Sequence, residues 1–388
     1  MNAKIQEQML EFIDAHEEEM IDFWRKLVLL ESPSRHKTGV DAVGRLLSEF
    51  CTKRLGYHLR WLDDEVYGNC LAACSCPFEE YKNGIAISAH MDTVHAVGSF
   101  DPVLEEDDAY LYGPGAGDCK GGIVLALMTA MTLKEIGYTE RPIKLLFAAD
   151  EESGGPTGTV FYPRELAGAA VMFNAESGIR EKIVAGRKAS LIAVYDIEGE
   201  AAHVGYLTDR PKSAIREAAK KLLALEDASD YHMLTFVGGV IQGGTVATSV
   251  PGSCSLQVNV RIRDDSAVEK AIGILEKVAE TTYVPGTSCR LTIRGNRVPM
   301  SEKLENLWLC QRFSQASKEL GYSSYEPFFS GGASDAAYAS SIGIPVICAS
   351  GPVVDFQHTR AERVLKCSMA ERAKVHVKVI TELPDKLG

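Results

Sequence analysis

The sequence predicts an α/β protein with a second, α+β domain inserted into its chain. Apolar strand patterns alternate with helical patterns before residue 187 and again after residue 296, which is typical of a sheet flanked by helices. Acidic and histidine residues follow several of the apolar runs, as expected at the C-terminal ends of strands in an open α/β sheet. The segment between, residues 187–296, has a β-α-β-β-α-β order instead. We therefore expect residues 1–186 and 297–388 to form one domain and residues 187–296 another.

Helical periodicity dominates the first fifty residues. It runs from Ile5 to Phe50 and is interrupted at Ser32-Pro33-Ser34. Short apolar runs then predict strands that alternate with helices. The expected strands are residues 58–62, 69–73, 85–90, 143–149 and 171–173, with a helix at 121–136.

The middle segment predicts a ferredoxin-like domain, the split β-α-β arrangement. Its expected strands are residues 190–197, 234–241, 253–261 and 289–294, and its expected helices are 213–224 and 266–279. The α/β pattern resumes afterwards, with helices at 304–320 and 368–381 and a strand at 344–349.

Composition limits the partners. The 388-residue chain has a net charge of −12, which argues against nucleic acid or an anionic membrane as its main partner. Ten cysteines occur without a CxxC…CxxC pair, and Cys70, Cys74 and Cys76 lie in an apolar stretch, so we expect buried free thiols, with a zinc site as the weaker alternative. The acidic amphipathic N-terminus has no signal-peptide core, and the longest apolar run, 123–133, is too short to span a bilayer. We expect a cytoplasmic protein.

His90 and Asp92, in SAHMDTV, follow an apolar strand. Neutral imidazole is a good zinc ligand, and a carboxylate two residues later can lie behind the ring and fix its tautomer. A hydrogen-bonded histidine in a turn would explain this pair alone equally well.

Asp118 lies in the glycine-rich segment GPGAGDCKGG. A phosphate-binding loop is the rival interpretation, but neither dinucleotide nor P-loop spacing is met, and Asp118 would repel a phosphate. The glycines more readily allow Asp118 to point inward from a tight turn.

Asp150, Glu151 and Glu152 end another apolar strand. The alternative is a solvated acidic loop, but the strand runs directly into these residues and Gly154-Gly155 follow. Buried carboxylates need a counter-charge, and a divalent metal is the simplest one. Of two adjacent carboxylates, one can then bind the metal while the other transfers protons. Glu176 and His358 complete a plausible ligand set, although spacing alone would not select them.

Eight motifs in order resemble the M20 family of dinuclear zinc peptidases and deacylases, and most of all its glutamate carboxypeptidase (carboxypeptidase G2-like) branch. They are HMDTV, GDCKGG, DEESGG, NAESG, EGEAAHVG, VPGSCSLQVNVRIRDD, GGASDAAYA and the final HT-x-x-E. The resemblance covers nearly the whole chain. It implies a zinc-peptidase catalytic domain with a central mixed sheet flanked by helices, and it identifies the inserted ferredoxin-like domain as a lid or dimerisation domain.

The resemblance also implies a role for each matched residue. His90 and Glu176 would bind one zinc ion, Glu152 and His358 the other, and Asp118 would bridge both. Asp92 would lie behind His90, and Glu151 would be the general base. Cobalt or manganese would also suit such ligands.

Residues of the lid and of the glycine-rich segment would complete the site. By resemblance, His203 stabilises the oxyanion in the other subunit of a homodimer, Arg261 engages the substrate carboxylate, and Gly331, Gly332, Ser334 and Asp335 line the cleft. Two departures from the family pattern, Thr248 in place of Asn and Cys119 where Met is frequent, put a preference for C-terminal glutamate in doubt.

We therefore expect a metallohydrolase that cleaves an amide bond in a small peptide or N-acyl amino acid with a free carboxylate. An N-acyl amino acid deacylase, similar to acetylornithine deacetylase or succinyl-diaminopimelate desuccinylase, is the alternative within the same chemistry. A catalytically silent binding protein would have lost Glu151 or a ligand, and none is lost. Nucleotide binding at residues 113–122 would depend on Lys120 alone.

Overall fold

The computed structural model describes residues 1–385, except for the side chain of Asn296, and it divides into two compact units. The first unit is made of Met1–Gly186, Glu302–Ser330 and the chain from Ser334 onward. The second is made of Arg187–Ser301 with Gly331–Ala333. It extends past the boundary at residue 296 expected from the sequence, because Arg187 and Met300 exchange two backbone hydrogen bonds, of 2.8 and 3.1 Å.

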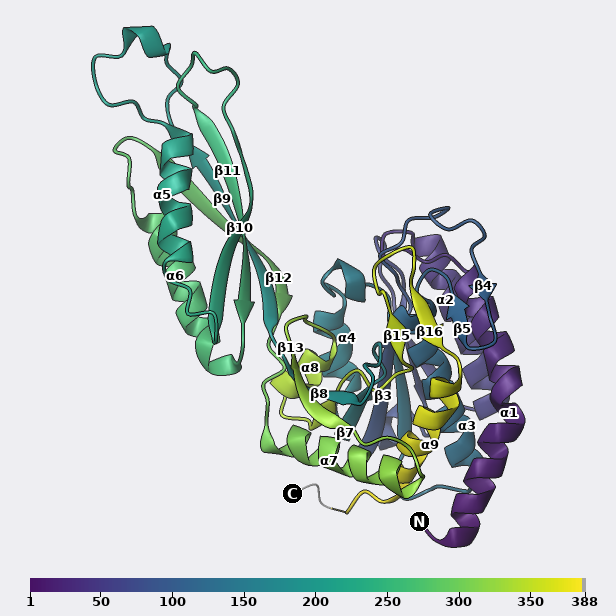
Figure 1. Ribbon diagram of the computed structural model, residues 1–388. Helices are drawn as coiled ribbons and strands as arrows, with labels where there is room; N and C mark the ends of the chain where they lie inside the picture. Colours follow the sequence, from purple (N-terminus) through teal and green to yellow (C-terminus); the bar gives the residue numbers. More distant parts are fainter. Residues whose placement is uncertain (386–388) are drawn as a thin grey trace. The chain divides into compact units, whose positions relative to one another are not determined.

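A six-stranded mixed sheet forms the centre of the first unit (Figure 1). Its strands are β1 (His58–Leu62), β2 (Cys70–Cys74), β3 (Gly84–His90), β6 (Ile143–Ala148), β7 (Ala169–Asn174) and β14 (Val346–Ile347), in the order β1-β2-β6-β3-β7-β14. β6, β3, β7 and β14 are parallel, whereas β2 is antiparallel to both β1 and β6. β3 and β6 are buried along their whole length, which explains their continuous apolar runs. The predicted mixed sheet is confirmed.

Helices flank this sheet, and five of them form two packed groups. They are α1 (Ala3–Leu29), α2 (Lys37–Phe50), α3 (Gly122–Glu135), α4 (Gly158–Glu165), α7 (Leu304–Glu319), α8 (Ala336–Ser341) and α9 (Cys367–Thr381). α1, α3 and α9 pack against one another and α3 contacts β3, whereas α4 and α8 pack together near β6, β7 and β14. The stretch Ala116–Glu135 is long and apolar enough to cross a membrane, but it is entirely buried inside the protein, as a core helix is.

Two small sheets in the first unit were missed by the sequence analysis. One has the order β15-β16-β5-β4 and consists of β4 (Glu105–Glu106), β5 (Tyr110–Tyr112), β15 (Val354–Asp355) and β16 (Arg363–Leu365). The other pairs β8 (Lys182–Arg187) with β13 (Glu326–Ser330). Because β16 pairs with β5, it brings the segment around His358 next to the turn that holds Asp118.

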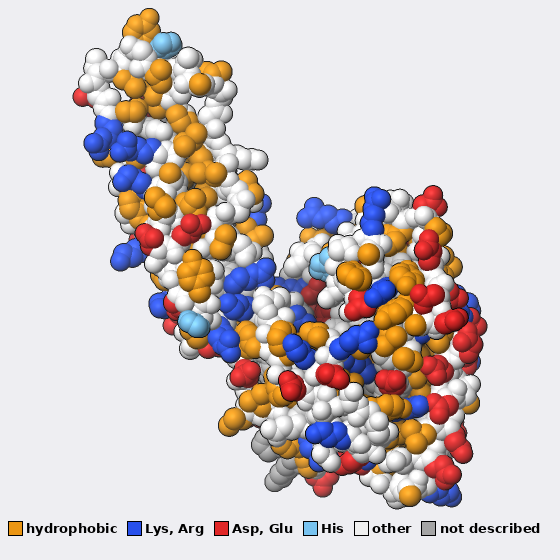
Figure 2. Space-filling view, viewed as in Figure 1, with side chains coloured by type: hydrophobic (Ala, Val, Ile, Leu, Met, Phe, Trp, Pro, Cys, Tyr) orange, Lys and Arg blue, Asp and Glu red, His pale blue; other side chains and the backbone are white. Residues whose placement is uncertain are grey.

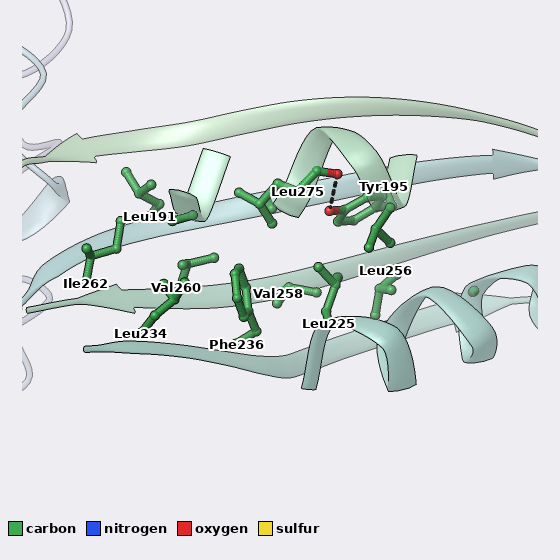
Figure 3. Close-up of a cluster of buried hydrophobic side chains, with 14 of the residues drawn as sticks. Leu191, Tyr195, Leu225, Leu234, Phe236, Leu256, Val258, Val260, Ile262 and Leu275 are labelled. Carbon is green, nitrogen blue, oxygen red and sulfur yellow. Dashed lines mark hydrogen bonds between the residues drawn. The ribbon is translucent and has the colours of Figure 1, made fainter. Parts of the chain in front are cut away.

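The second unit has the predicted ferredoxin-like fold. Its elements are β9 (Ala189–Glu198), α5 (Ala214–Glu226), β10 (Leu234–Gly243), β11 (Ser253–Ile262), α6 (Val268–Glu280) and β12 (Ser288–Arg297), with antiparallel strands in the order β10-β11-β9-β12. Alternate residues of β11 are buried, so one face of the sheet packs under α5 and α6. Figure 3 shows this core, in which the Tyr195 hydroxyl donates a 3.0 Å hydrogen bond to the Leu275 carbonyl.

The edge strand β10 exposes apolar side chains. Val237, Val240 and Ile241 are 49%, 40% and 47% exposed, and we call them the β10 edge patch. Figure 2 shows hydrophobic side chains gathered along this unit. An exposed edge strand of this kind is able to pair with another chain.

Candidate metal centre

Three parallel strands bring ligand-type side chains to one edge of the central sheet. β3 ends at His90, β6 leads into Glu151 and Glu152, and β7 leads into Glu176. The C-terminal ends of parallel strands lie at the same edge, where sites in such sheets are expected. The Asp118 turn (residues 113–122) and the segment around His358 complete the cluster. Three overlapping groups have ligand atoms within 4.8 Å of one another: His90 with Asp118, Cys119 and Glu176; His90 with Glu151 and Glu152; and Asp118 with Glu152 and His358.

The imidazole of His90 is oriented by its own loop. Its Nδ1 lies 2.9 Å from the Asp92 carbonyl oxygen and 3.2 Å from the Asp92 carboxylate, so Nδ1 carries a hydrogen. Nε2 therefore points into the cluster, 3.1 Å from Asp118 Oδ1 and 3.8 Å from Glu176 Oε2. A ligand histidine in proteins is held in this way, with the second nitrogen donating to an oxygen behind it.

Asp118 is shared between two histidines. Its Oδ1 faces His90 Nε2, while its Oδ2 lies 3.2 Å from His358 Nε2 and accepts a 2.9 Å hydrogen bond from Gln357 Nε2. His358 Nε2 is also 3.2 Å from Glu152 Oε1. The two oxygens of this one carboxylate thus face two different imidazoles.

Asp92 is fully buried and saturated with hydrogen bonds. It accepts from the Ser34 hydroxyl at 2.6 Å and from the backbone N–H groups of Glu151 and Glu152, both at 3.0 Å. One carboxylate thus holds both the ring of His90 and the turn that presents Glu151 and Glu152. The chain positions the half-buried Glu151 side chain beside the His90 and Glu152 ligand atoms.

The cluster carries an excess of negative charge. Hydrogen bonds to Asp118 and Glu152 raise the pKa of His358 to about 11. Burial disfavours the charged form of His90, but the surrounding acidic groups outweigh burial and raise its pKa well above the ordinary value. Both shifts come from nearby acidic groups, whose negative charge a bound cation would also neutralise. Two imidazoles with Asp118, Glu152 and Glu176 form a donor set that fits divalent metal ions.

The Asp118 turn is held by the protein itself. The Trp24 Nε1–H donates to the Ala116 carbonyl at 2.8 Å, and the buried Lys120 amine donates to the carbonyls of Leu30 and Pro114 at 2.9 and 3.0 Å. Lys120 is the one basic residue in this turn, and it is not available to a phosphate. This geometry argues against the nucleotide-binding alternative.

The sequence also led us to expect Ser334, His203, Arg261, Gly331 and Gly332 in the site. Ser334 is buried in the first unit, where its hydroxyl lies 3.3 Å from Cys348 Sγ. The second unit holds His203, Arg261, Gly331 and Gly332. His203 is exposed and accepts from the Gly205 N–H at 3.1 Å, and the half-buried Arg261 donates to Asn259 Oδ1 at 2.9 Å.

Three residues that contact the cluster, and a fourth that contacts one of the three, were missed by the sequence analysis as functional residues. Ser34 and Gln357 contact Asp92 and Asp118, while His95 pairs with Glu362 at 2.9 Å and Glu362 contacts the Asp118 turn. Only Glu362 had a signal, as the last residue of HT-x-x-E. The ten cysteines are free. Of the three in the apolar stretch, Cys70 and Cys74 are buried as expected, whereas Cys76 is half-buried.

The chain is similar in sequence to known proteins. Residues 86–382 match the family model for peptidase family M20/M25/M40. Carboxypeptidase G2 from Pseudomonas sp. (strain RS-16) is 27% identical over 373 residues, 92% of this chain and 88% of that protein. Succinyl-diaminopimelate desuccinylase from Wolinella succinogenes is 26% identical over 297 residues, 72% of this chain and 78% of that protein.

Solved structures share the fold at lower identity. A tripeptidase from Staphylococcus aureus superposes with a TM-score of 0.76 at 22% identity, covering 94% of this chain and 97% of that one. A metallo-carboxypeptidase of the M20 family from Sulfolobus solfataricus has a TM-score of 0.74 at 16% identity and covers 93% of this chain and 98% of that one. The resemblance drawn from the motifs is confirmed.

Proposed function

The chain belongs to peptidase family M20/M25/M40, and from this we propose that it is a dinuclear metallohydrolase that cleaves an amide bond. The observation that carries this proposal is the carboxylate of Asp118, which lies between His90 and His358. We propose His90 and Glu176 as ligands of one ion, Glu152 and His358 as ligands of the other, and Asp118 as the bridge.

Zinc suits these imidazole and carboxylate donors, and cobalt or manganese can replace it. When bound, such ions lower the pKa of water and polarise a carbonyl group. The residues of the chain would supply the remaining chemistry. Glu151 takes a proton from the attacking water and returns it to the leaving amine nitrogen, and Asp92 keeps the His90 ring in its ligand orientation. In the proposed homodimer, His203 of one subunit stabilises the oxyanion of the tetrahedral intermediate in the other subunit.

The proposed substrates are small peptides or N-acyl amino acids with a free carboxylate. Arg261 is the proposed partner of that carboxylate, because a guanidinium can bind it with two parallel hydrogen bonds. Gly331, Gly332 and Ser334 are proposed to line the substrate cleft. The relatives include a carboxypeptidase and a desuccinylase, so either product class fits the metal set.

Two further properties belong to the proposal. The β10 edge patch supports a homodimer through the second unit, since exposed apolar edges favour strand pairing between chains. Ten free cysteines support a reducing cytoplasm as its location.

Hydrolysis of a panel of dipeptides and N-acyl amino acids, with Zn²⁺ added, tests the function. We expect Glu151→Gln to lower kcat at least about 100-fold, because a general base contributes on the order of 10²–10⁴-fold. Both metals should remain bound, as measured by metal analysis. The exposed Glu140→Gln is the matched control and should retain full activity.

Release of a C-terminal amino acid, or of acetate or succinate, distinguishes the peptidase from the deacylase. Equal kcat for wild type and Glu151→Gln would remove Glu151 from its role. A wild-type protein that binds metal and hydrolyses nothing in the panel would favour the silent binding protein.

A further inference from the structure

Glu362 lies where three ligand-bearing segments meet. It is 1% exposed, and its Oε1 accepts hydrogen bonds from the backbone N–H groups of Gly117 and Asp118, at 3.1 and 3.2 Å. Its Oε2 lies 2.9 Å from Nε2 of the buried His95. Glu362 itself follows His358 by four residues. One carboxylate therefore contacts the Asp118 turn and the loop after His90 from within the segment that carries His358.

The small sheet explains why Glu362 reaches this position. β5 ends at Tyr112, directly before the Asp118 turn, and β16 begins at Arg363, directly after Glu362. Arg363 and Tyr112 are partners in the antiparallel register. The register therefore places Glu362 beside the beginning of the turn, where the N–H groups of Gly117 and Asp118 need an acceptor because they are buried.

His95 brings the third segment to this junction. It follows Asp92 by three residues, in the loop after β3. Its ring packs edge-on against Phe100, with centroids 5.0 Å apart, and this contact limits the directions that Nε2 can take. The His90 loop, the Asp118 turn and the His358 segment are thus linked through two side chains that are not themselves proposed ligands.

We propose that Glu362, with His95, is a positioning residue that holds these three segments in register and thereby sets how tightly the centre binds its metal ions. This inference rests on the proposed function. Glu362 acts through Asp118: with the backbone N–H of Asp118 fixed, the Asp118 carboxylate is held between the two imidazoles. Partners that orient ligands from behind typically contribute about 10–100-fold to metal affinity.

A purely structural role is the competing explanation, and the second unit supplies a matched control for it. Glu217 is also 1% exposed, and its carboxylate accepts from two adjacent backbone N–H groups, those of Tyr283 and Val284, at 3.2 and 2.7 Å. Glu217 and both donors belong to the second unit, whereas every proposed metal ligand belongs to the first. Its loss should lower stability without changing metal affinity.

The test titrates Zn²⁺ against a chromophoric chelator for the full-length wild type, Glu362→Ala, Glu362→Gln, His95→Gln and Glu217→Gln. We expect Glu362→Ala to weaken metal binding about 10–100-fold. Glu362→Gln should lose less, because its amide oxygen can still accept from Gly117 and Asp118. The visible spectrum of the Co²⁺-loaded protein should change in both Glu362 variants and stay as in wild type in Glu217→Gln. On the best substrate, kcat should fall more than KM changes.

The measured metal affinities and spectra either support or reject the positioning role of Glu362. The positioning role would be overturned if the wild type binds two ions and the Glu362 variants keep the same metal affinity and the same Co²⁺ spectrum. The proposed function would then remain intact. Absence of Zn²⁺ and Co²⁺ binding by wild type would overturn the proposed function as well. If Glu362→Ala does not fold, Glu362→Gln and His95→Gln carry the test: unchanged affinity in both rejects the inference, and weaker binding in both supports it.

Discussion

Asp118 lies between two histidines that stand 268 positions apart in the chain, His90 and His358. The sequence could predict His90, Glu151 and Glu152 as candidates, because each ends a recognisable apolar strand and such strand ends meet at one edge of the sheet. Glu176 and His358 were selected only by resemblance to a family. Ser34, Gln357 and His95 could not be predicted, since their contacts join loops whose proximity no local pattern encodes.

His376, in α9, is a buried histidine that the sequence analysis did not single out. Burial lowers the pKa of its imidazole from 6.5 to about 3. Its Nε2–H donates to the Ser350 carbonyl at 3.2 Å, and Nδ1 has no hydrogen-bond partner among the described residues, so the folded protein keeps this ring neutral. Between about pH 6.5 and pH 3, the unfolded chain binds a proton here that the folded protein does not, so this residue reduces stability as the pH falls through that window.

We expect His376→Gln to reduce the slope of the unfolding free energy against pH in that window by up to about 1.4 kcal/mol per pH unit. Urea titrations between pH 4 and 7, with chelator in excess, would measure the slope. His58→Gln, which removes an exposed histidine, controls for the loss of a histidine as such. An unchanged slope in His376→Gln would show that this ring binds protons in the folded protein as it does in the unfolded chain.

At the level of elements, the long helices and most of the buried strands of both units were predicted to within a few residues, because they repeat the helical or strand period several times. The buried β8 and its partner β13 were missed, although they have six and five residues. β4 and β15 have two residues each, and β5 and β16 have three. Strands this short carry too little periodicity to recognise, yet the pairing of β5 with β16 brings two parts of the metal centre together.

Gly122, at the start of α3, is required by the close approach of the segment that precedes Glu176. A Cβ at this position would lie 1.9 Å from the Ala175 carbonyl oxygen and 2.8 Å from Cys119 Sγ. We expect Gly122→Ala to lower the free energy of unfolding by about 1–3 kcal/mol, because overpacking a rigid site forces the backbone to shift. Urea unfolding monitored by circular dichroism would measure this change.

Gly273, in the middle of α6, is the matched helical control. A Cβ there would meet nothing within 4 Å. Gly273→Ala should therefore raise the free energy of unfolding by about 0.4–1 kcal/mol through the lower entropy of the unfolded chain. Destabilisation by both substitutions to the same degree would contradict the steric explanation for Gly122.

At the scale of the whole molecule, the sequence predicted an insertion because the order of elements changes within the chain. The ferredoxin-like order is a strong signal, since helices and strands alternate in a sequence that few other folds use. The acidic net charge argued against nucleic acid and an anionic membrane as the main partner, but it did not identify a partner. The relatives similar over most of the chain include both a carboxypeptidase and a desuccinylase, so overall similarity favours neither product class.

The β10 edge patch carries the prediction about assembly. We expect the wild type to be a dimer and the double variant Val237→Lys, Ile241→Lys to be a monomer, because charges on an exposed edge prevent strand pairing between chains. Sedimentation velocity would measure the mass of each. Leu304→Lys, at an 82% exposed position of α7, is the control and should remain dimeric. A double variant that still sediments as a dimer would place the interface elsewhere, and a monomeric wild type would end the dimer proposal.

Trp24 gives the centre an intrinsic fluorescence signal. Its indole is fully buried, donates a hydrogen bond to the Ala116 carbonyl at 2.8 Å, and so contacts the turn that presents Asp118. Indole emission is sensitive to its hydrogen bonding and to the polarity around it. Occupation of the centre by Zn²⁺, which has no visible absorption of its own, should therefore shift or quench the emission of Trp24, and Trp24→Phe should abolish that change while Trp61 and Trp308 still emit.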